Sequence, residues 1–149
     1  MVDIDALIWI KADKKPIDVA VYIYVDSALN KINSISQRPI PELIEVGLEE
    51  HEIRSQWTIP SRAEMESYKR ESSTYNVRSG SILVDEMLLC DCVVSNHIEE
   101  LSVDGKSFSL QRDLDGQLDA QSIKDMKSLH SGIYDALYAK YCMEACLFV

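Results

Sequence analysis

The chain has 149 residues, of which 46% are hydrophobic and 27% are charged, and its formal net charge is −10. This length and composition predict one folded domain (residues 1–149) with a core of its own, and they argue against a disordered chain. The apolar runs are much shorter than the roughly 20 residues that cross a bilayer, and the N-terminus lacks the basic start of a signal peptide. We therefore expect a soluble protein that makes no membrane contact and stays where it is made.

The negative charge is concentrated in two parts of the sequence. Residues 39–53 contain five glutamates and neither Lys nor Arg, and residues 79–149 contain 12 acidic and 5 basic residues. Direct binding to a nucleic-acid backbone depends on clustered Lys and Arg, so it is not expected here. A basic protein surface is the better match, and Glu45, Glu49 and Glu50 are candidate partner-binding residues.

Residues 4–25 have a pattern that fits either strands or a helix. The apolar residues alternate as in a strand around residues 17–25, but their spacing also fits one face of a helix. The β-branched and aromatic content favours a strand, which the turn "ADKKP" would pair with residues 7–11. A helix is then predicted over residues 26–36.

A connector and a capped helix are predicted next. Pro39 and Pro41 in "SQRPIPELIE" exclude a continuous helix and predict an internal hinge near residues 37–42. Further on, Ser61 is an N-cap candidate and Glu64 follows three residues later, which predicts a capping box at the start of a helix over residues 61–72.

The second half of the chain predicts a loop, two helices and a hairpin. The composition of "STYNVRSGS" is typical of a loop, and the apolar spacing that follows predicts a buried helix over residues 82–97. Asp-Gly between two alternating runs predicts a hairpin at about residues 100–110. A last helix is expected over residues 120–147, capped by Asp119, with Gly132 marking close packing or a bend. The elements predict a mainly helical α+β fold with three to four helices, a short β-hairpin and, if residues 4–25 are strands, an N-terminal strand pair.

The segment "DLDGQLDAQS" resembles the middle of a calcium-binding loop. When Gly116 is aligned with the glycine of that loop, Gln111 and Ser122 replace the first carboxylate and the bidentate glutamate, so the oxygen shell of calcium is incomplete. An Asp-Gly turn followed by a helix that Asp119 caps explains the segment instead.

The four cysteines form two close pairs. Cys142 and Cys146 share one helical face, but Cys90 and Cys92 lie about 200° apart around a helix, so all four reach one zinc ion only if that stretch is extended. Reduced cysteines in the core fit the pattern better. The three histidines have no metal-ligand spacing and no nucleophile motif is present, so we predict no metal, no cofactor and no catalytic residue.

Aromatic residues are the remaining candidates for a binding role. Tyr134, Tyr138 and Tyr141 occupy more than the core stripe of the last helix, and with Phe148 in the apolar ending they give it a second apolar surface. We take these residues and Trp57 as candidate partner-binding residues, with burial in the domain's own core as the alternative.

Four features together resemble small accessory proteins of tailed bacteriophages, which sit in or help assemble the neck, tail or baseplate of the virion. These features are the segment "WTIPSRAEMESYKRESSTYN", a buried central helix, a "VDGK" hairpin and the tyrosine-rich "IYDALYAKY". The resemblance covers residues 57–141. It implies a non-enzymatic structural or assembly subunit that forms an oligomer or a complex with other protein subunits, in the host cytoplasm or in the assembled virion. The charge suggests an alternative, an acidic inhibitor that mimics nucleic acid and blocks a DNA- or RNA-binding enzyme.

Overall fold

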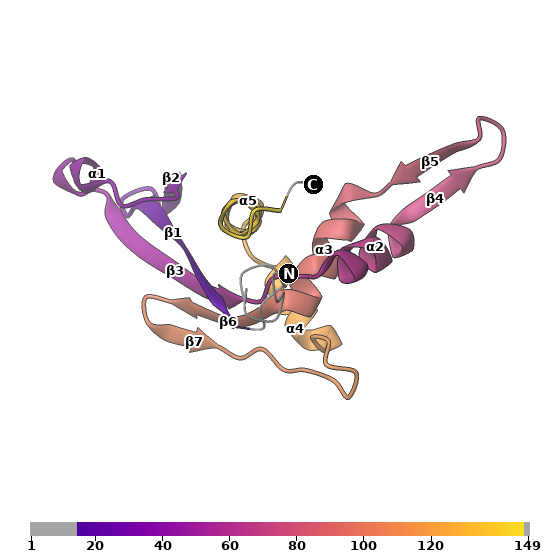
Figure 1. Cartoon of the computed structure of the whole chain (residues 1–149). Coiled ribbons are helices and arrows are strands. Elements are labelled where there is room, and N and C mark those ends of the chain that lie inside the picture. The colour runs from indigo at the N-terminus through magenta and orange to yellow at the C-terminus, as the bar shows by residue number, and fades with distance from the viewer. Residues whose placement is uncertain (1–14, 148–149) are drawn as a thin grey trace, which may run out of the picture.

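A computed structural model describes residues 15–147, which form a five-stranded antiparallel sheet, a separate two-stranded hairpin and five helices (Figure 1). The sheet has the strand order β2-β1-β3-β6-β7. Its strands are β1 (Ile17–Asp26), β2 (Lys31–Ser36), β3 (Glu49–Trp57), β6 (Ile98–Val103) and β7 (Lys106–Phe108). The hairpin joins β4 (Ser73–Asn76) to β5 (Ser81–Val84). The helices are α1 (Pro41–Glu45), α2 (Arg62–Glu71), α3 (Glu86–His97), α4 (Ala120–Lys127) and α5 (Ser131–Glu144).

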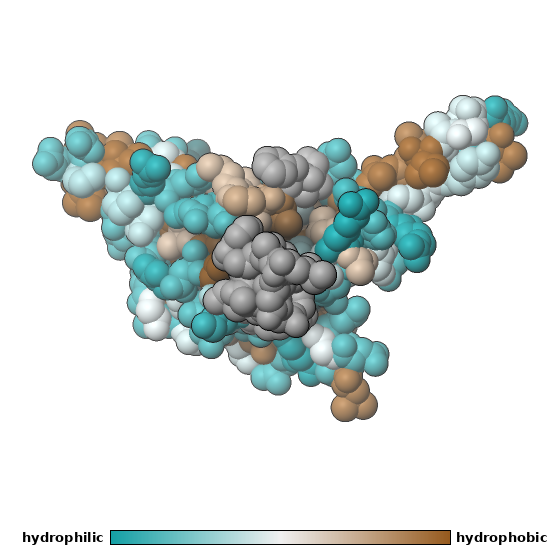
Figure 2. All heavy atoms as spheres, in the orientation of Figure 1, coloured by the Kyte–Doolittle hydropathy of each residue, from teal (hydrophilic) through white to brown (hydrophobic). Residues whose placement is uncertain are grey.

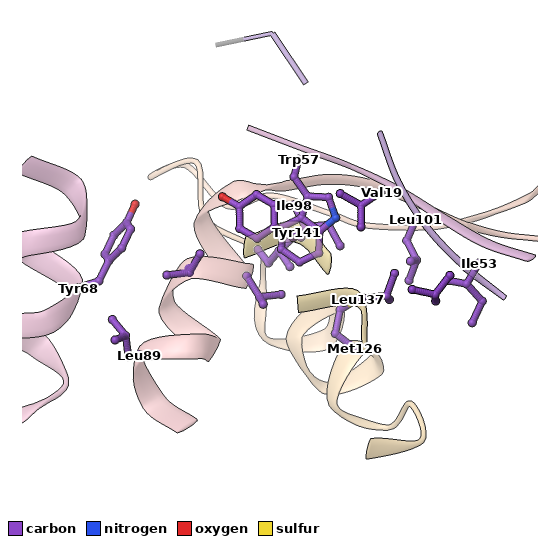
Figure 3. Close-up of a cluster of buried hydrophobic side chains, with 14 of the residues drawn as sticks. Val19, Ile53, Trp57, Tyr68, Leu89, Ile98, Leu101, Met126, Leu137 and Tyr141 are labelled. Carbon is purple, nitrogen blue, oxygen red and sulfur yellow. The ribbon is translucent and has the colours of Figure 1, made fainter. Parts of the chain in front are cut away.

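The main core lies between one face of the sheet and α5. Side chains alternate between the faces of a strand, so Val19 and Val21 of β1 share a face with Ile53 of β3 and Leu101 of β6. None of these four side chains is more than 4% exposed. α5 packs against β1 and contributes Leu137 to the same cluster, as Figure 3 shows.

The packing of α5 on the sheet centres on a stacked pair of aromatic rings. Trp57 and Tyr141 lie parallel with their ring centroids 4.3 Å apart (Figure 3). The indole N–H of Trp57 donates to the Ser55 hydroxyl at 2.6 Å, and that hydroxyl donates to the Val19 carbonyl at 2.8 Å. Tyr141 donates its hydroxyl to the Thr58 carbonyl at 2.8 Å. Each of these buried donors has a partner, which holds α5 in one position on the sheet.

Several local predictions are confirmed. β1 occupies the predicted strand, and α2 and α3 lie within the predicted helices. The capping box is present: the Ser61 hydroxyl accepts from the Glu64 amide at 3.2 Å, and the Glu64 carboxylate accepts from the Ser61 amide at 3.1 Å. The hairpin β6–β7 turns at Asp104 and Gly105, whose φ angles of +50° and +82° are those that a two-residue hairpin turn needs.

The prediction of a mainly helical fold is wrong, because the structure has 33% strand and 37% helix. Residues 26–36 form the last residue of β1, a turn and β2 rather than a helix. Asn30 takes a φ of +51° in that turn, which reverses the chain and lets β2 pair with β1. Residues 73–84 are the β4–β5 hairpin rather than a loop, so the apolar run at 82–84 belongs to a strand. The pairing partner predicted at residues 7–11 lies outside the described residues.

The helix predicted over residues 120–147 is two helices, α4 and α5, separated at residues 128–130. His130 is the N-cap of α5, and its Nδ1 accepts a hydrogen bond from the Gly132 amide at 3.0 Å. A Cβ on Gly132 would lie 3.0 Å from Cδ1 of Ile35, so this glycine marks close packing between α5 and β2. Within residues 15–147, no helix is long and apolar enough to cross a membrane.

Candidate interaction surface

The β4–β5 hairpin, residues 73–84, projects from the body of the protein, and we call it the arm (Figure 1). Cross-strand partners share a face, so Tyr75 and Ile82 lie side by side, with Val84 next along that face. Their exposed fractions are 65%, 68% and 43%, and Val77 in the turn is 84% exposed. Figure 2 shows hydrophobic side chains along this projection. The arm therefore presents an apolar surface to solvent.

The turn of the arm is built from local hydrogen bonds. The side-chain oxygen of Asn76 accepts from the amides of Arg78 and Ser79 at 3.0 and 3.3 Å, and the Asn76 carbonyl accepts from the Gly80 amide at 2.8 Å. Gly80 has a φ of +68°, which glycine adopts without steric cost. These contacts fix the four-residue turn and set the register that places Tyr75 opposite Ile82.

The root of the arm continues directly into two packed helices. α2 enters the arm, α3 leaves it, and the two helices contact each other. The Asp85 amide donates to the Ser72 carbonyl at 2.7 Å, which closes the hairpin at its base. The Asp85 carboxylate also accepts from the Leu88 amide at 3.1 Å and caps α3. The position of the arm is thus set by the α2–α3 pair.

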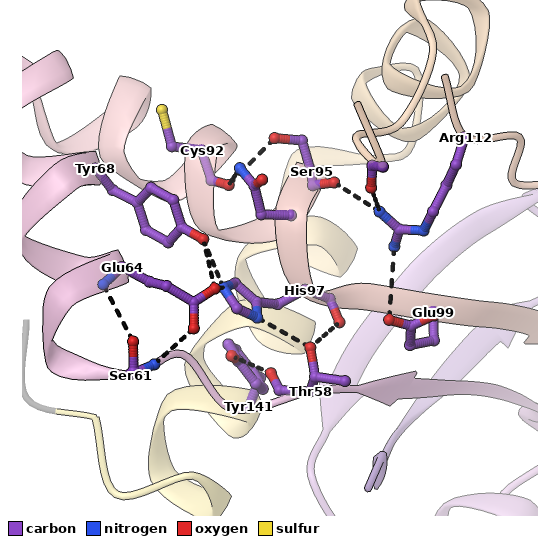
Figure 4. Close-up of polar contacts among 12 residues, drawn as sticks. Thr58, Ser61, Glu64, Tyr68, Cys92, Ser95, His97, Glu99, Arg112 and Tyr141 are labelled. Carbon is purple, nitrogen blue, oxygen red and sulfur yellow. Dashed lines mark hydrogen bonds and ion pairs between the residues drawn. The ribbon is translucent and has the colours of Figure 1, made fainter. Parts of the chain in front are cut away.

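A buried polar network fastens these two helices to the sheet (Figure 4). His97, at the end of α3, is 3% exposed. Its Nε2 lies 2.8 Å from the Tyr68 hydroxyl of α2, and its Nδ1 lies 2.9 Å from the Thr58 hydroxyl that follows β3. The Glu64 carboxylate approaches Nε2 at 3.7 Å. Both ring nitrogens are used inside the protein, so the geometry gives this histidine a structural role.

A groove of about 590 Å³ lies between α3, α4 and α5, beside the root of the arm. We call it the helical groove, and its lining includes the side chains of Glu86, Met87, Leu129, Tyr134, Asp135 and Tyr138. The volume is within the range of about 300–1,000 Å³ that is typical of ligand pockets. Glu86 and Asp135 are exposed and make the rim acidic. The groove therefore combines an apolar lining with negative charge.

Hydrogen bonds order the floor of the helical groove. The Tyr134 hydroxyl donates to the Asp91 carboxylate at 2.9 Å, and Lys127 lies 3.0 Å from the other oxygen of that carboxylate. Burial raises the pKa of Tyr134, and it raises the pKa of the Cys90 thiol to about 12. Both groups are therefore protonated at neutral pH, and Cys90 is a poor nucleophile. This arrangement suits binding better than covalent chemistry.

The aromatic candidates from the sequence fall in different places. Trp57 and Tyr141 are 1% and 0% exposed, so they belong to the core rather than to an available surface. Tyr134 and Tyr138 are half-buried and line the helical groove. Phe148 lies outside the described residues. The structure thus brings two of the five aromatic candidates together at one surface.

The acidic candidates lie at one end of the sheet. Glu45 is exposed on α1, and Glu49 is exposed at the start of β3, where its carboxylate is 3.3 Å from Nε2 of His51. Glu50 accepts a hydrogen bond from the Tyr24 hydroxyl at 2.8 Å. Glu49 and Glu50 therefore interact with side chains of their own protein.

Sequence reasoning missed the apolar face of the arm, which Tyr75, Ile82 and Val84 form. The available signal was β-branched and aromatic residues on both sides of "NVRSGS", with Asn76 and Gly80 as turn residues. Within residues 15–147, no group of three or more His, Cys, Asp or Glu is placed to hold a metal ion. The predicted turn is confirmed, since the Gly116 amide donates to the Asp113 carbonyl at 3.1 Å, and so is the helix cap, since the Asp119 carboxylate accepts from the Ser122 amide at 2.8 Å.

Comparisons with family models, with curated proteins and with solved structures found no match to this chain.

Proposed function

We propose that this protein is a non-enzymatic structural or assembly subunit of a larger protein particle, and that it acts through protein–protein interfaces. The arm is the observation that supports this proposal most strongly. An isolated two-stranded hairpin is marginally stable in water, and this one exposes Tyr75, Ile82 and Val84 on one face. Burial of each large apolar side chain against another protein would contribute about 1.5–3 kcal/mol. A partner surface therefore stabilises both the arm and the complex.

The proposed particle is the virion of a tailed bacteriophage, with this protein in or assembling the neck, tail or baseplate. That part of the proposal depends on the resemblance of residues 57–141 to small accessory proteins of such virions. The partners are accordingly other protein subunits, in the host cytoplasm during assembly or in the finished virion.

The alternative, an acidic inhibitor that mimics nucleic acid, has less support from the geometry. A mimic needs carboxylates that are free to replace phosphates. Glu50 instead accepts from Tyr24, and Glu52 forms an ion pair with Arg54 at 3.0 Å. Two of the five glutamates at residues 42–52 are therefore already engaged by side chains of the sheet.

Incorporation of the full chain into particles tests the proposed function. The chain would be expressed in its native host as wild type, as Ile82→Asp or as Ser81→Asp, and the virions would be purified on a density gradient. Ser81 faces the opposite side of the same hairpin, where Leu83 is the exposed apolar residue, so Ser81→Asp adds the same charge away from Tyr75, Ile82 and Val84. We expect a fixed number of wild-type and Ser81→Asp copies per particle and at least tenfold fewer of Ile82→Asp. A chain that never enters particles, or that enters them equally in all three forms, would contradict the proposal.

A further inference from the structure

We propose that the arm of one copy of this protein inserts into the helical groove of a second copy. The inference deepens the proposed function and rests on it, because it names the first partner of the assembly subunit. Two different surfaces would meet, the apolar face of the arm and the lining between α3, α4 and α5. Each is present once per chain in the described structure, so every contact uses one arm and one groove.

The charges of the two surfaces are complementary. Residues 73–84 contain one charged residue, Arg78, which lies exposed in the turn. The helical groove is lined by three carboxylates, of Glu86, Asp91 and Asp135, and by one ammonium group, of Lys127. Insertion of the arm would bring the guanidinium of Arg78 to this acidic rim, where attraction favours the correct orientation.

The apolar parts also match in kind. The arm presents an aromatic ring and β-branched side chains, and the groove presents Met87, Leu129 and Tyr138 among its lining residues. Burial of these apolar side chains against one another would favour occupation of the groove by the hairpin.

The geometry favours a second molecule over the same one. The arm and α3 are joined without a linker, since β5 ends at Val84 and α3 begins at Glu86. In Figure 1 the arm points away from α5, which forms the far wall of the groove. Folding the arm back into its own groove would break the α2–α3 pair and its contacts with His97. An arm from a neighbouring copy enters without that cost.

Contacts of this kind join unlike surfaces. When two chains form one such contact, one arm and one groove of the pair are still unoccupied. Further chains can therefore bind until a ring closes or a filament forms, unless the two chains exchange arms reciprocally. Both outcomes place the arm of one chain in the groove of another, and a ring is a suitable form for a neck, tail or baseplate component.

The first test is the mass of the purified full chain in a dilution series by analytical ultracentrifugation. We expect wild type to associate reversibly into multiples of the 16.9 kDa chain. Ile82→Asp on the arm and Ser131→Trp in the groove should each weaken association at least tenfold. The controls are Ser81→Asp, on the other face of the hairpin, and Ala139→Trp, exposed on α5 outside the groove lining; both should associate as wild type does.

Mixing the two defective variants gives a sharper result. The chain with Ile82→Asp keeps an intact groove and the chain with Ser131→Trp keeps an intact arm, so a mixture can form one productive junction. We expect each variant alone to sediment as a monomer and the mixture to give a discrete 1:1 dimer. All of the substituted side chains are exposed, and unchanged circular dichroism would show that the variants are folded.

A charge exchange completes the design. Arg78→Glu and Asp135→Arg should each weaken association, and the double variant should restore it. A wild-type chain that remains monomeric at every concentration, or arm and groove variants that behave like their controls, would overturn the inference. If such a monomer still enters particles in an arm-dependent way, the arm binds a different subunit and the proposed function stands. If the chain associates with itself but never enters particles, the proposed function fails instead.

Discussion

Tyr68→Phe tests the buried network that holds the arm in position. The substitution keeps the aromatic ring and removes the hydroxyl that lies 2.8 Å from Nε2 of His97. Tyr68 is 7% exposed and His97 is 3% exposed, so water does not easily replace the lost partner, and the Glu64 carboxylate at 3.7 Å from Nε2 is too far to form a hydrogen bond without moving. An unsatisfied buried polar group costs about 1–3 kcal/mol, and we expect the free energy of unfolding to fall by that amount.

Urea unfolding, followed by circular dichroism, measures this change. For a chain of this length each kcal/mol lowers the Tm by about 2–4 °C, so thermal unfolding should show a fall of roughly 2–12 °C. The urea midpoint should decrease while its slope stays constant, as expected for a change in stability alone. Tyr75→Phe is the matched control, because it removes a hydroxyl from a tyrosine that is 65% exposed. Its effect should stay within about 0.5 kcal/mol.

Equal effects of the two substitutions would refute the reasoning. In that case the hydrogen bonds between α2, α3 and the end of β3 would add no measurable stability, and they would not be what holds the base of the arm in position. Amide hydrogen exchange in α2 separates local from global effects. We expect faster exchange there in Tyr68→Phe than in Tyr75→Phe.

Three further predictions follow from other contacts. Tyr141→Phe removes the bond to the Thr58 carbonyl and should lower the free energy of unfolding by about 1–3 kcal/mol in the same urea assay; no change would show that this bond is not needed to hold α5. Gly132→Val should destabilise the protein by about 1–3 kcal/mol in thermal unfolding, because even a Cβ there lies 3.0 Å from Ile35, and a stabilising effect would contradict the close packing. The hydrogen bond between His51 and Asp104, at 2.6 Å, raises the pKa of His51 and lowers the pKa of Asp104. The stability that comes from the raised His51 pKa is fully present below about pH 6.5, and it is lost as the pH rises through that raised pKa. The stability that comes from the lowered Asp104 pKa is lost as the pH falls through that lowered pKa. Both side chains are partly exposed, so this gain is below about 1 kcal/mol. Asp104→Asn should move the His51 pKa back toward about 6.5 in an NMR titration, and an unchanged titration would rule out this partner.

Local signals in the sequence predicted local structure well. Ser61 and Glu64 form the expected capping box, and Asp104 and Gly105 form the expected hairpin turn. Both features depend on residues within a few positions of one another, so their hydrogen bonds and backbone angles follow from the local sequence. The same holds for Asp119 as the cap of α4.

Elements that depend on distant pairing were not predictable in the same way. Over residues 26–36 the spacing of Ala28, Ile32 and Ile35 fits one face of a helix. Pairing with β1, through a register shift between Tyr24 and Val25, instead makes residues 31–36 a strand. The break between α4 and α5 falls at residues 128–130, where no proline interrupts the helical spacing. The arm has a loop-like composition. Its residues cover no part of the five-stranded sheet, so they do not show the apolar alternation that a strand with one buried face would have.

The same distinction explains the candidate site. Trp57 and Tyr141 are 84 positions apart in the sequence and meet as a stacked pair in the core, which residue type alone does not indicate. Tyr134 and Tyr138 reach the helical groove because the break before α5 sets the direction of that helix. The tyrosine pattern predicted that Tyr134, Tyr138 and Tyr141 give the last helix a second apolar surface; the structure places Tyr134 and Tyr138 at the groove and Tyr141 in the core.

Hydrogen–deuterium exchange of the β4 and β5 amides, in the free chain and in the assembled particle, tests the central claim most directly. A projecting hairpin opens readily when it is alone and is protected when another protein covers it. We predict fast exchange in residues 73–84 of the free chain and at least tenfold slower exchange in the particle. Equal exchange of these amides in both states, with protection confined to other parts of the chain, would contradict the role of the arm as a docking element.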